Sequence, residues 1–229
     1  RYRSVQSVMA EIKLLYHEYG VREIHIEDDN FTLRRPYVVR FCDEVMKSGL
    51  DIAFALPNGV RLDTFDQGLL LLMEAAGFYS MAVGIESGSD RVLKLMKKNL
   101  STAVIREKIE LIKAYTKIQL TGFFLIGYPG ETEAEVLETT AFSRSLQIDK
   151  ASFMFVMPLP GSQLWDAYKS KNESIDLAKF FYYRIVPGVS EIPPKRLRSL
   201  HRWAVLGFYL RPRILWGLIR EIKSVDQVL

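Results

Sequence analysis

The chain contains a single cysteine, Cys42, among its 229 residues. One thiol excludes an internal disulfide framework, and it equally excludes a cysteine-ligated iron–sulfur cluster built from this chain alone. Cys42 shares the helical spacing of the apolar residues Val38, Phe41 and Val45, so we expect a buried, chemically inert side chain. The scarcity of cysteine predicts a reducing, cytoplasmic location.

The sequence also lacks long apolar runs. No stretch reaches the roughly 20 residues that a membrane-spanning helix requires. The first residues, Arg1–Ser4, carry neither a signal-peptide pattern nor an initiator methionine, which leads us to expect a truncated piece of a longer protein. The histidines His17, His25 and His201 lack metal-ligand spacing, and neither a Walker motif nor a dinucleotide fingerprint is present. The sequence therefore predicts no metal ligand and no catalytic residue within this chain.

Positive charge is concentrated in the tail. The whole chain carries +4; residues 195–229 hold eight Lys or Arg against two acids, so residues 1–194 are slightly acidic and do not predict a nucleic-acid binder. In the tail, basic residues alternate with apolar ones, which is typical of a helix lying on anionic lipid. The alternative is that the apolar face packs on the protein itself. The residues concerned are Arg202, Trp203, Phe208, Tyr209, Arg211, Arg213, Leu215, Trp216, Leu218, Ile219, Arg220, Ile222 and Lys223.

Five short apolar runs recur at 23–27, 51–56, 80–85, 119–126 and 151–157. They begin roughly 30–40 residues apart with helical patterns between them, the spacing of successive βα units. This predicts an α/β fold, a partial (β/α) barrel with parallel strands, plus a helical C-terminal extension. We expect the barrel over residues 1–160, without its first strand, a connecting segment over 161–194, and a basic amphipathic helical tail over 195–229.

Helix ends are marked along the chain. Gly20 and Gly49 are placed to terminate helices, and Asp66 to begin one. Thr132 followed by Glu135 forms a capping box.

Polar residues gather where the predicted strands end, the edge at which parallel sheets bind ligands. Asp28 and Asp29 follow the first run and predict capture of an amine or a metal, or else a solvated turn. After the second run, Asn58 begins a turn with Gly59, and Arg61 is placed to bind a carboxylate or to form an ordinary exposed ion pair.

The third and fourth runs end in glycine-rich loops. Glu86 and Ser87, flanked by small residues, offer acceptors for ribose hydroxyls or an amine, while Ser89 or Asp90 is placed to cap the next helix. The turn over residues 127–132 is rich in Gly and Pro and could present backbone groups to a ligand.

The segments IHIEDDNFT, PNGVRLD, VGIESGSDRVLKLMKK, GFFLIGYPGETEAE and PLPGSQLW, in this order over residues 1–165, resemble the radical S-adenosylmethionine (SAM) superfamily. More narrowly, they are similar to the cobalamin-dependent branch that includes the anaerobic magnesium-protoporphyrin ester cyclase. The resemblance implies a 4Fe–4S cluster held by CxxxCxxC, which cleaves SAM to a 5′-deoxyadenosyl radical or uses it for methyl transfer. It also implies a small, lipophilic substrate, an electron donor, and cobalamin in an upstream domain.

Carried over by position, the resemblance places the methionine-amine contact at Asp28 and Asp29 and the ribose contact at Glu86 and Ser87. Leu125 and Gly127 would line the adenine, and Asn58 and Arg61 complete the predicted cofactor-binding set. CxxxCxxC is absent, so we expect the cluster ligands outside this chain, an oxidoreductase or methyltransferase as the parent, and no activity from the chain alone.

Two other functions are open at this point. One is a metal- or phosphate-dependent barrel enzyme that uses Asp28, Asp29 and Glu86 as ligands. The other is a degenerate barrel that serves as a non-catalytic binding module. A peripheral membrane contact through the tail is compatible with each of them.

Overall fold

The computed structural model describes residues 2–171, 177 and 180–221. Two parts of the predicted segments lie outside the described residues: positions 172–176 and 178–179 of the connecting segment, and positions 222–229 of the tail, including Ile222 and Lys223. The chain forms two compact units. Unit 1 holds residues 1–84 and 103–121, and unit 2 holds residues 85–102 and 122–229.

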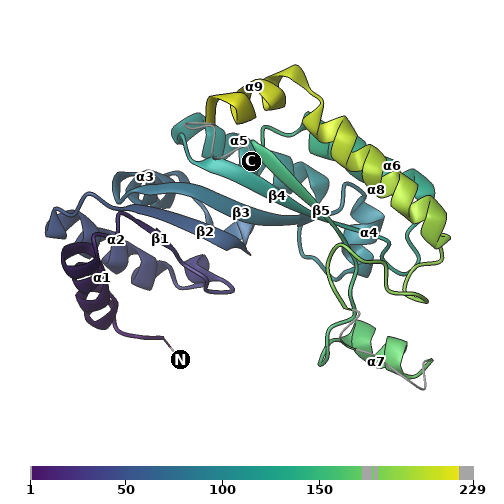
Figure 1. The fold of residues 1–229 in the computed structure, drawn as a ribbon, viewed down its shortest axis with the longest axis horizontal. Coiled ribbons are helices and arrows are strands. Elements are labelled where there is room, and N and C mark those ends of the chain that lie inside the picture. The colour runs from purple at the N-terminus through teal and green to yellow at the C-terminus, as the bar shows by residue number, and fades with distance from the viewer. Residues whose placement is uncertain (1, 172–176, 178–179, 222–229) are drawn as a thin grey trace. The chain divides into compact units, whose positions relative to one another are not determined.

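Five strands form one sheet in the order of the sequence, β1-β2-β3-β4-β5 (Figure 1). β1 pairs with β2, and β2 with β3, in parallel, because each crossover returns the chain to the same edge through a helix. The strands confirm the predicted α/β fold with parallel strands; their bounds are Glu23–His25, Ala53–Val60, Phe78–Glu86, Gln119–Ile126 and Lys150–Phe155.

Unit 1 surrounds its strands with helices whose ends follow the predicted signals. Gly20 ends α1 in the left-handed conformation, Gly49 ends α2 in the same way, and the Asp66 carboxylate accepts the Leu69 N–H at the start of α3. The helices of this unit are α1 (Val5–Tyr19), η1 (Phe31–Leu33), α2 (Arg35–Ser48), η2 (Leu62–Thr64), α3 (Gln67–Ala75) and α5 (Thr102–Tyr115).

The core of unit 1 is aromatic. Phe31, Phe41, Phe54 and Phe78 form a cluster in which the contacting rings have centroids 5.3–6.2 Å apart. Cys42 is fully buried among these apolar groups, as predicted. Burial raises the pKa of its thiol to about 12, so the thiolate that reactions and metals require does not form near neutral pH.

The predicted turn at Asn58-Gly59 is wrong. β2 continues through both residues to Val60, and the pairing with β3 shifts between Leu56 and Val60. Leu56 pairs with Met81 and Val60 pairs with Val83, so β2 has two more residues than β3 between these two pairs. A bulge accommodates the extra residues, and Gly59 supplies the positive φ of 95° that favours glycine.

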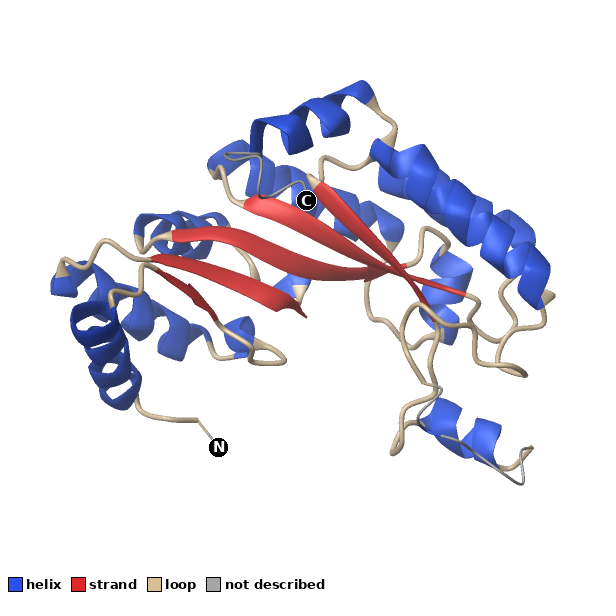
Figure 2. Cartoon of the chain, in the orientation of Figure 1, coloured by secondary structure: helices blue, strands red, loops and turns tan. Residues whose placement is uncertain are grey.

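Unit 2 packs its long helix α8 along α6 and against β5 (Figure 2). α8 buries Leu197, Leu200, Ala204 and Phe208, so this face of the predicted tail is core, as the packing alternative required. No helix among the described residues is long and apolar enough to cross a membrane.

The helices of unit 2 are α4 (Asp90–Leu95), α6 (Glu133–Ser145), α7 (Gln163–Lys169), α8 (Pro194–Tyr209) and α9 (Pro212–Glu221).

Candidate functional site

Glu86 is the last residue of β3 and has a left-handed backbone, with φ of 68°. Such a conformation is costly for a residue with a side chain and is found mainly where function requires it. The Lys98 Nζ donates to Glu86 Oε1 over 2.9 Å, and both side chains are about three-quarters buried. A carboxylate held at the carboxyl end of a parallel strand is placed as the sequence predicted.

Ser87 lies beside Glu86 but is fully buried. Its Oγ is 3.1 Å from Thr139 Oγ1 on α6 and accepts the Ser89 N–H over 3.1 Å. Thr139 Oγ1 also accepts the Gly88 N–H over 2.9 Å. The Ser87 hydroxyl is therefore used to hold the loop against α6, and Glu86 is the side chain of the predicted ribose pair that retains a partly exposed acceptor.

Glu135 ties the loop after β3 to the turn after β4. Arg91 donates to both of its carboxylate oxygens over 2.6 Å and to the Gly130 carbonyl over 2.6 Å. Ser89 Oγ donates to Glu135 as well, and Thr132 and Glu135 form the predicted capping box. The Arg91 guanidinium and these donors lower the pKa of Glu135 to about 2. Ser89 thus bonds to Glu135 and makes no side-chain cap for α4.

The turn after β4 closes around Glu131. Its Oε2 accepts hydrogen bonds from the N–H groups of Gly127 and Tyr128 over 2.6 and 3.2 Å. The Gly130 N–H donates to Glu191 Oε2 over 2.7 Å. These backbone donors are engaged within the protein and are not presented to a ligand. Gly127 has φ of 86°, and a Cβ there would approach Leu197 Cδ2 to 2.8 Å, so the position accepts only glycine without strain.

Glu131 is a buried carboxyl, 2% exposed. Its Oε1 has no hydrogen-bond partner among the described residues. Burial is the main reason that its pKa rises to about 7, against the opposing pull of the two backbone donors. The turn therefore contains a group that changes charge near neutral pH.

A mostly apolar cavity of about 410 Å³ opens in unit 2 beside the end of β4. Leu125 lines it, as do Met96 after α4 and Met157 after β5. Its other lining residues are Leu95, Lys97, Tyr128, Val156, Leu159, Ser162, Gln163, Leu164 and Tyr182. Apolar and thioether side chains with a few polar groups at the rim suit a flat, hydrophobic ring.

In unit 1, Asp28 and Asp29 are exposed and line a separate cavity of about 560 Å³ with Tyr2, Arg3 and Tyr37. The pKa of Tyr37 is raised by burial and, second, by the Asp28 charge. The side chains of the other two predicted residues of this unit form hydrogen bonds or ion pairs within unit 1. Asn58 Nδ2 donates to the Glu27 carbonyl over 2.6 Å, and Arg61 pairs with Asp63 at the surface, which is the ordinary ion pair considered above.

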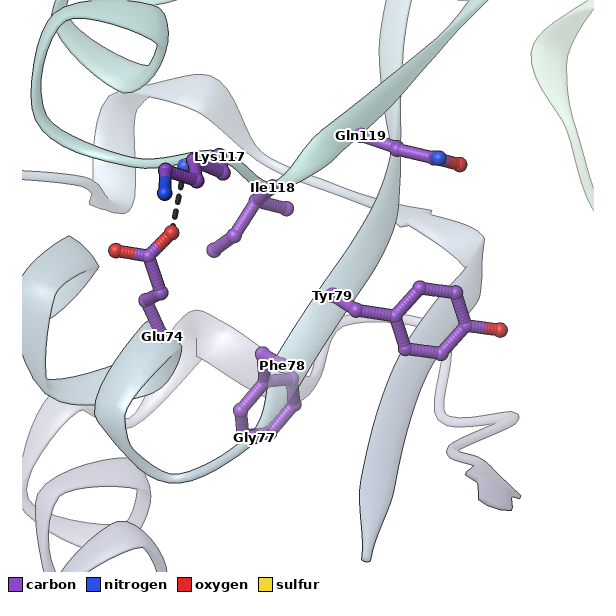
Figure 3. Close-up of a pocket in the computed structure, with 7 residues that line it drawn as sticks. All are labelled: Glu74, Gly77, Phe78, Tyr79, Lys117, Ile118 and Gln119. Atoms are coloured by element: carbon purple, nitrogen blue, oxygen red, sulfur yellow. Dashed lines mark hydrogen bonds between the residues drawn. The ribbon is translucent and has the colours of Figure 1, made fainter. Parts of the chain in front are cut away.

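A third cavity, of about 330 Å³, lies in unit 1 at the amino ends of β3 and β4 (Figure 3). Gly77, Phe78, Tyr79, Ile118 and Gln119 line it, and the Lys117 N–H donates to Glu74 Oε1 over 2.5 Å. Ligands of parallel α/β sheets bind at the opposite, carboxyl edge. This cavity is therefore not the candidate site.

The chemistry of the described residues does not fit a metal centre. They contain no group of three or more His, Cys, Asp or Glu side chains that could hold a metal ion, and the single thiol is buried in its protonated form. A 4Fe–4S cluster requires three or four thiolates. The metal-dependent alternative has no support from this arrangement.

The family model described as the radical SAM superfamily matches residues 1–143. The chain belongs to this superfamily. An uncharacterised methyltransferase of Pyrococcus horikoshii is 32% identical over 219 residues, which cover 94% of this chain and 47% of the relative. The anaerobic magnesium-protoporphyrin IX monomethyl ester cyclase of Rubrivivax gelatinosus is 26% identical over 180 residues, covering 79% of this chain and 32% of the relative.

Among solved structures, the radical SAM methyltransferase TsrM of Kitasatospora setae, with cobalamin and a [4Fe-4S] cluster bound, matches with a TM-score of 0.65. The match covers 90% of this chain and 38% of that one at 17% identity, and so establishes a shared fold. The radical SAM chain thus spans between about a third and a half of the curated relatives named above.

Three residues at the site were not foreseen from the sequence. Arg91 and Lys98 belong to a run that reads as a solvated helix face, and Glu131 reads as part of an exposed turn. The segment GIESGSDR gives no sign that Arg91 contacts a carboxylate 44 residues later, because that contact is created by the packing of α6.

Proposed function

We propose that this chain is the SAM-binding part of a radical SAM methyltransferase whose cluster ligands are supplied from outside the chain. The observation that carries the proposal is the arrangement in unit 2. An apolar cavity lined by Leu125 opens at the end of β4, and a strained, lysine-held carboxylate, Glu86, ends β3.

The residues present fit the adenosyl half of SAM. The cavity wall of Leu125, Met96 and Met157 would contact the two faces of an adenine, and Glu86 would accept hydrogen bonds from ribose hydroxyls. Lys98 holds the Glu86 carboxylate in place, while the Glu135 network fixes both loops before a ligand arrives. The methionine-amine contact that the resemblance assigns to Asp28 and Asp29 stays a prediction, and both of these carboxylates are exposed in unit 1.

Bound cofactors supply the electron-transfer chemistry of such enzymes, and the protein positions them and excludes water. The residues of this chain do not fit the cluster, so we assign them binding and orienting roles. Similarity to a methyltransferase supports methyl transfer as the outcome, and the cobalamin in the Kitasatospora structure supports a cobalamin-dependent route. A small lipophilic substrate and an electron donor complete the proposal.

Binding of S-adenosylhomocysteine to the purified chain, measured by isothermal titration calorimetry, tests the nucleoside site. We expect saturable binding that Glu86→Ala and Leu125→Ser each weaken roughly tenfold, since each removes one contact that is worth on the order of 1.4 kcal/mol. Lys47→Ala, which alters an exposed ion pair of the other unit and lies outside the predicted cofactor-binding set, is the matched control. Absence of binding, or binding that Leu125→Ser leaves unchanged, would contradict the assignment.

Methyl transfer is tested on the protein that carries this chain together with its cluster ligands. With SAM labelled at the methyl group, a methyltransferase passes the label to its substrate. If the label stays in methionine and 5′-deoxyadenosine accumulates alone, the chemistry is not methyl transfer, although the nucleoside site would stand.

A further inference from the structure

The described part of the C-terminal region leaves large apolar side chains in solvent on two consecutive helices. On α8, Trp203, Leu206 and Leu210 are 60, 53 and 63% exposed. Their spacing of three and four residues places them on one face, while Leu200, Ala204 and Phe208 on the opposite face are buried. Packing on the protein therefore covers one face of α8 and leaves a second apolar face in solvent.

α9 repeats the pattern more strongly. Ile214 is buried and anchors the helix, whereas Leu215, Trp216 and Ile219 are 40, 57 and 57% exposed. These three residues lie at positions i, i+1 and i+4, so they form one apolar face. Arg213 and Arg220 lie together on the neighbouring face, about 20° apart on a helical wheel, and the Arg220 guanidinium is 5.0 Å from the Trp216 ring centre.

The charge of these helices is one-sided. From Pro194 to Glu221 the sequence holds seven Lys or Arg and one acid. Arg196 pairs with Glu133, and Arg211 donates to the carbonyls of Phe208 and Arg144. The exposed cations Lys195, Arg198, Arg202 and Arg213 form no ion pair within the described residues. The positive charge of these helices is therefore largely unbalanced by acids of the described residues.

We propose that α8 and α9 dock on an anionic phospholipid surface, with Trp203, Leu206, Leu210, Leu215, Trp216 and Ile219 entering the headgroup boundary. Tryptophan with aliphatic residues on one face and arginines beside them is the composition of helices that lie in the membrane plane. The charge complementarity to anionic headgroups selects this occupant over an electroneutral apolar partner.

Co-sedimentation of the full chain with vesicles tests the proposal. We expect binding to phosphatidylcholine vesicles that contain phosphatidylglycerol, weak binding to phosphatidylcholine alone, and release by salt. Arg198→Gln with Arg202→Gln should weaken binding roughly tenfold or more, at about one kilocalorie per cation near the surface. Trp216→Ser with Ile219→Ser should abolish it, and the tryptophan emission should shift to the blue only in chains that bind.

The matched control is Leu14→Ser with Tyr19→Ser on α1, where the same kind of side chain is 52 and 73% exposed. It should bind vesicles like the unaltered chain. Because every altered residue is exposed, all variants should keep the melting temperature, whereas deletion of α8 would remove buried core. Three results would overturn the proposal: no binding to anionic vesicles, equal loss in the control, or a dimer that Trp216→Ser dissociates in light scattering.

Discussion

The loops at the carboxyl ends of the strands differ between the two units. In unit 2, the loops after β3 and β4 are fixed by charged and polar groups with little exposure, Ser87, Glu131 and Glu135. In unit 1, Asp28 and Asp29 after β1 are exposed, and the Arg61–Asp63 pair after β2 lies at the surface. One set of loops is organised before any ligand arrives, and the other is solvated.

The difference shows what burial does to the same chemical groups. Arg91 with Glu135 and Arg61 with Asp63 are both bidentate pairs. The Glu135 carboxylate also accepts from Ser89 and Thr132 and its side chain is only 10% exposed, so the Arg91–Glu135 pair joins two loops. An exposed pair contributes little because water and salt screen it. Burial and shared donors therefore fix the loops of unit 2, whereas the charged groups after β1 and β2 in unit 1 stay in contact with water.

The largest expected effect comes from Gly88→Ala in unit 2. A Cβ at Gly88 would lie 2.7 Å from the Cα of Thr139 and 2.9 Å from the Glu138 carbonyl oxygen, and backbone atoms of a packed helix cannot move aside cheaply. We expect a loss of about 3 kcal/mol or more in the free energy of unfolding, measured by urea denaturation. Gly68→Ala in α3, where a Cβ meets nothing closer than 3.4 Å, should be neutral or stabilising by up to about 1 kcal/mol.

Glu131→Gln should change how stability depends on pH. The pKa of this carboxyl is about 7 in the folded chain against an ordinary 4.5, so between these values the folded state keeps a proton that the unfolded state releases. Stability therefore falls as the pH rises through this window, by about 2–3 kcal/mol. The amide does not titrate, so the variant should lose this slope in denaturation curves collected from pH 4 to 8.

Asp66→Asn in unit 1 is the control for Glu131→Gln, because the fold lowers the pKa of Asp66 whereas it raises the pKa of Glu131. The Leu69 N–H is the main cause that holds the pKa of Asp66 below its ordinary 3.8, so the carboxylate is charged in both states above about pH 5 and contributes no slope there. Asparagine also caps helices well. The variant should therefore keep the slope above pH 5, and a loss of slope in both variants would contradict the assignment to Glu131.

Glu135→Gln and Asp63→Asn compare the two arginine pairs directly. We expect about 2 kcal/mol of destabilisation for Glu135→Gln, less than for a fully buried pair because Arg91 is half exposed. The exposed pair should cost less than about 1 kcal/mol. Raising the salt concentration should shrink the effect of Asp63→Asn more than that of Glu135→Gln. Equal effects on the unfolding midpoint would show that burial does not separate the two loops.

Several features of the chain were readable from local patterns. The capping signals at Gly20, Asp66 and Thr132 depend on contacts between residues a few positions apart. The spacing of apolar residues, which is equally local, indicated the strands that end at Glu86 and Ile126. The motif order predicted the radical SAM superfamily, which the family model confirms. The binding roles of the predicted site residues stay predictions, because no structure with a ligand tests them.

Local signals failed where distant segments decide the outcome. Asn58-Gly59 is a good turn sequence, yet both residues stay within β2, in a bulge flanked by the pairs Leu56–Met81 and Val60–Val83 with β3. The contact between the Ser87 and Thr139 hydroxyls likewise depends on the packing of α6 and has no signal in the local sequence.

What the sequence by itself determined is therefore the set of elements, their caps and the superfamily, because these depend on side-chain period and on contacts between near neighbours. The tertiary structure decided which groups lose water. It buried Glu131 without a partner for one oxygen, joined Arg91 to Glu135 across 44 positions, and covered one face of α8 while leaving Trp203 in solvent. Desolvation depends on what packs against a residue, and neighbours along the chain do not specify that.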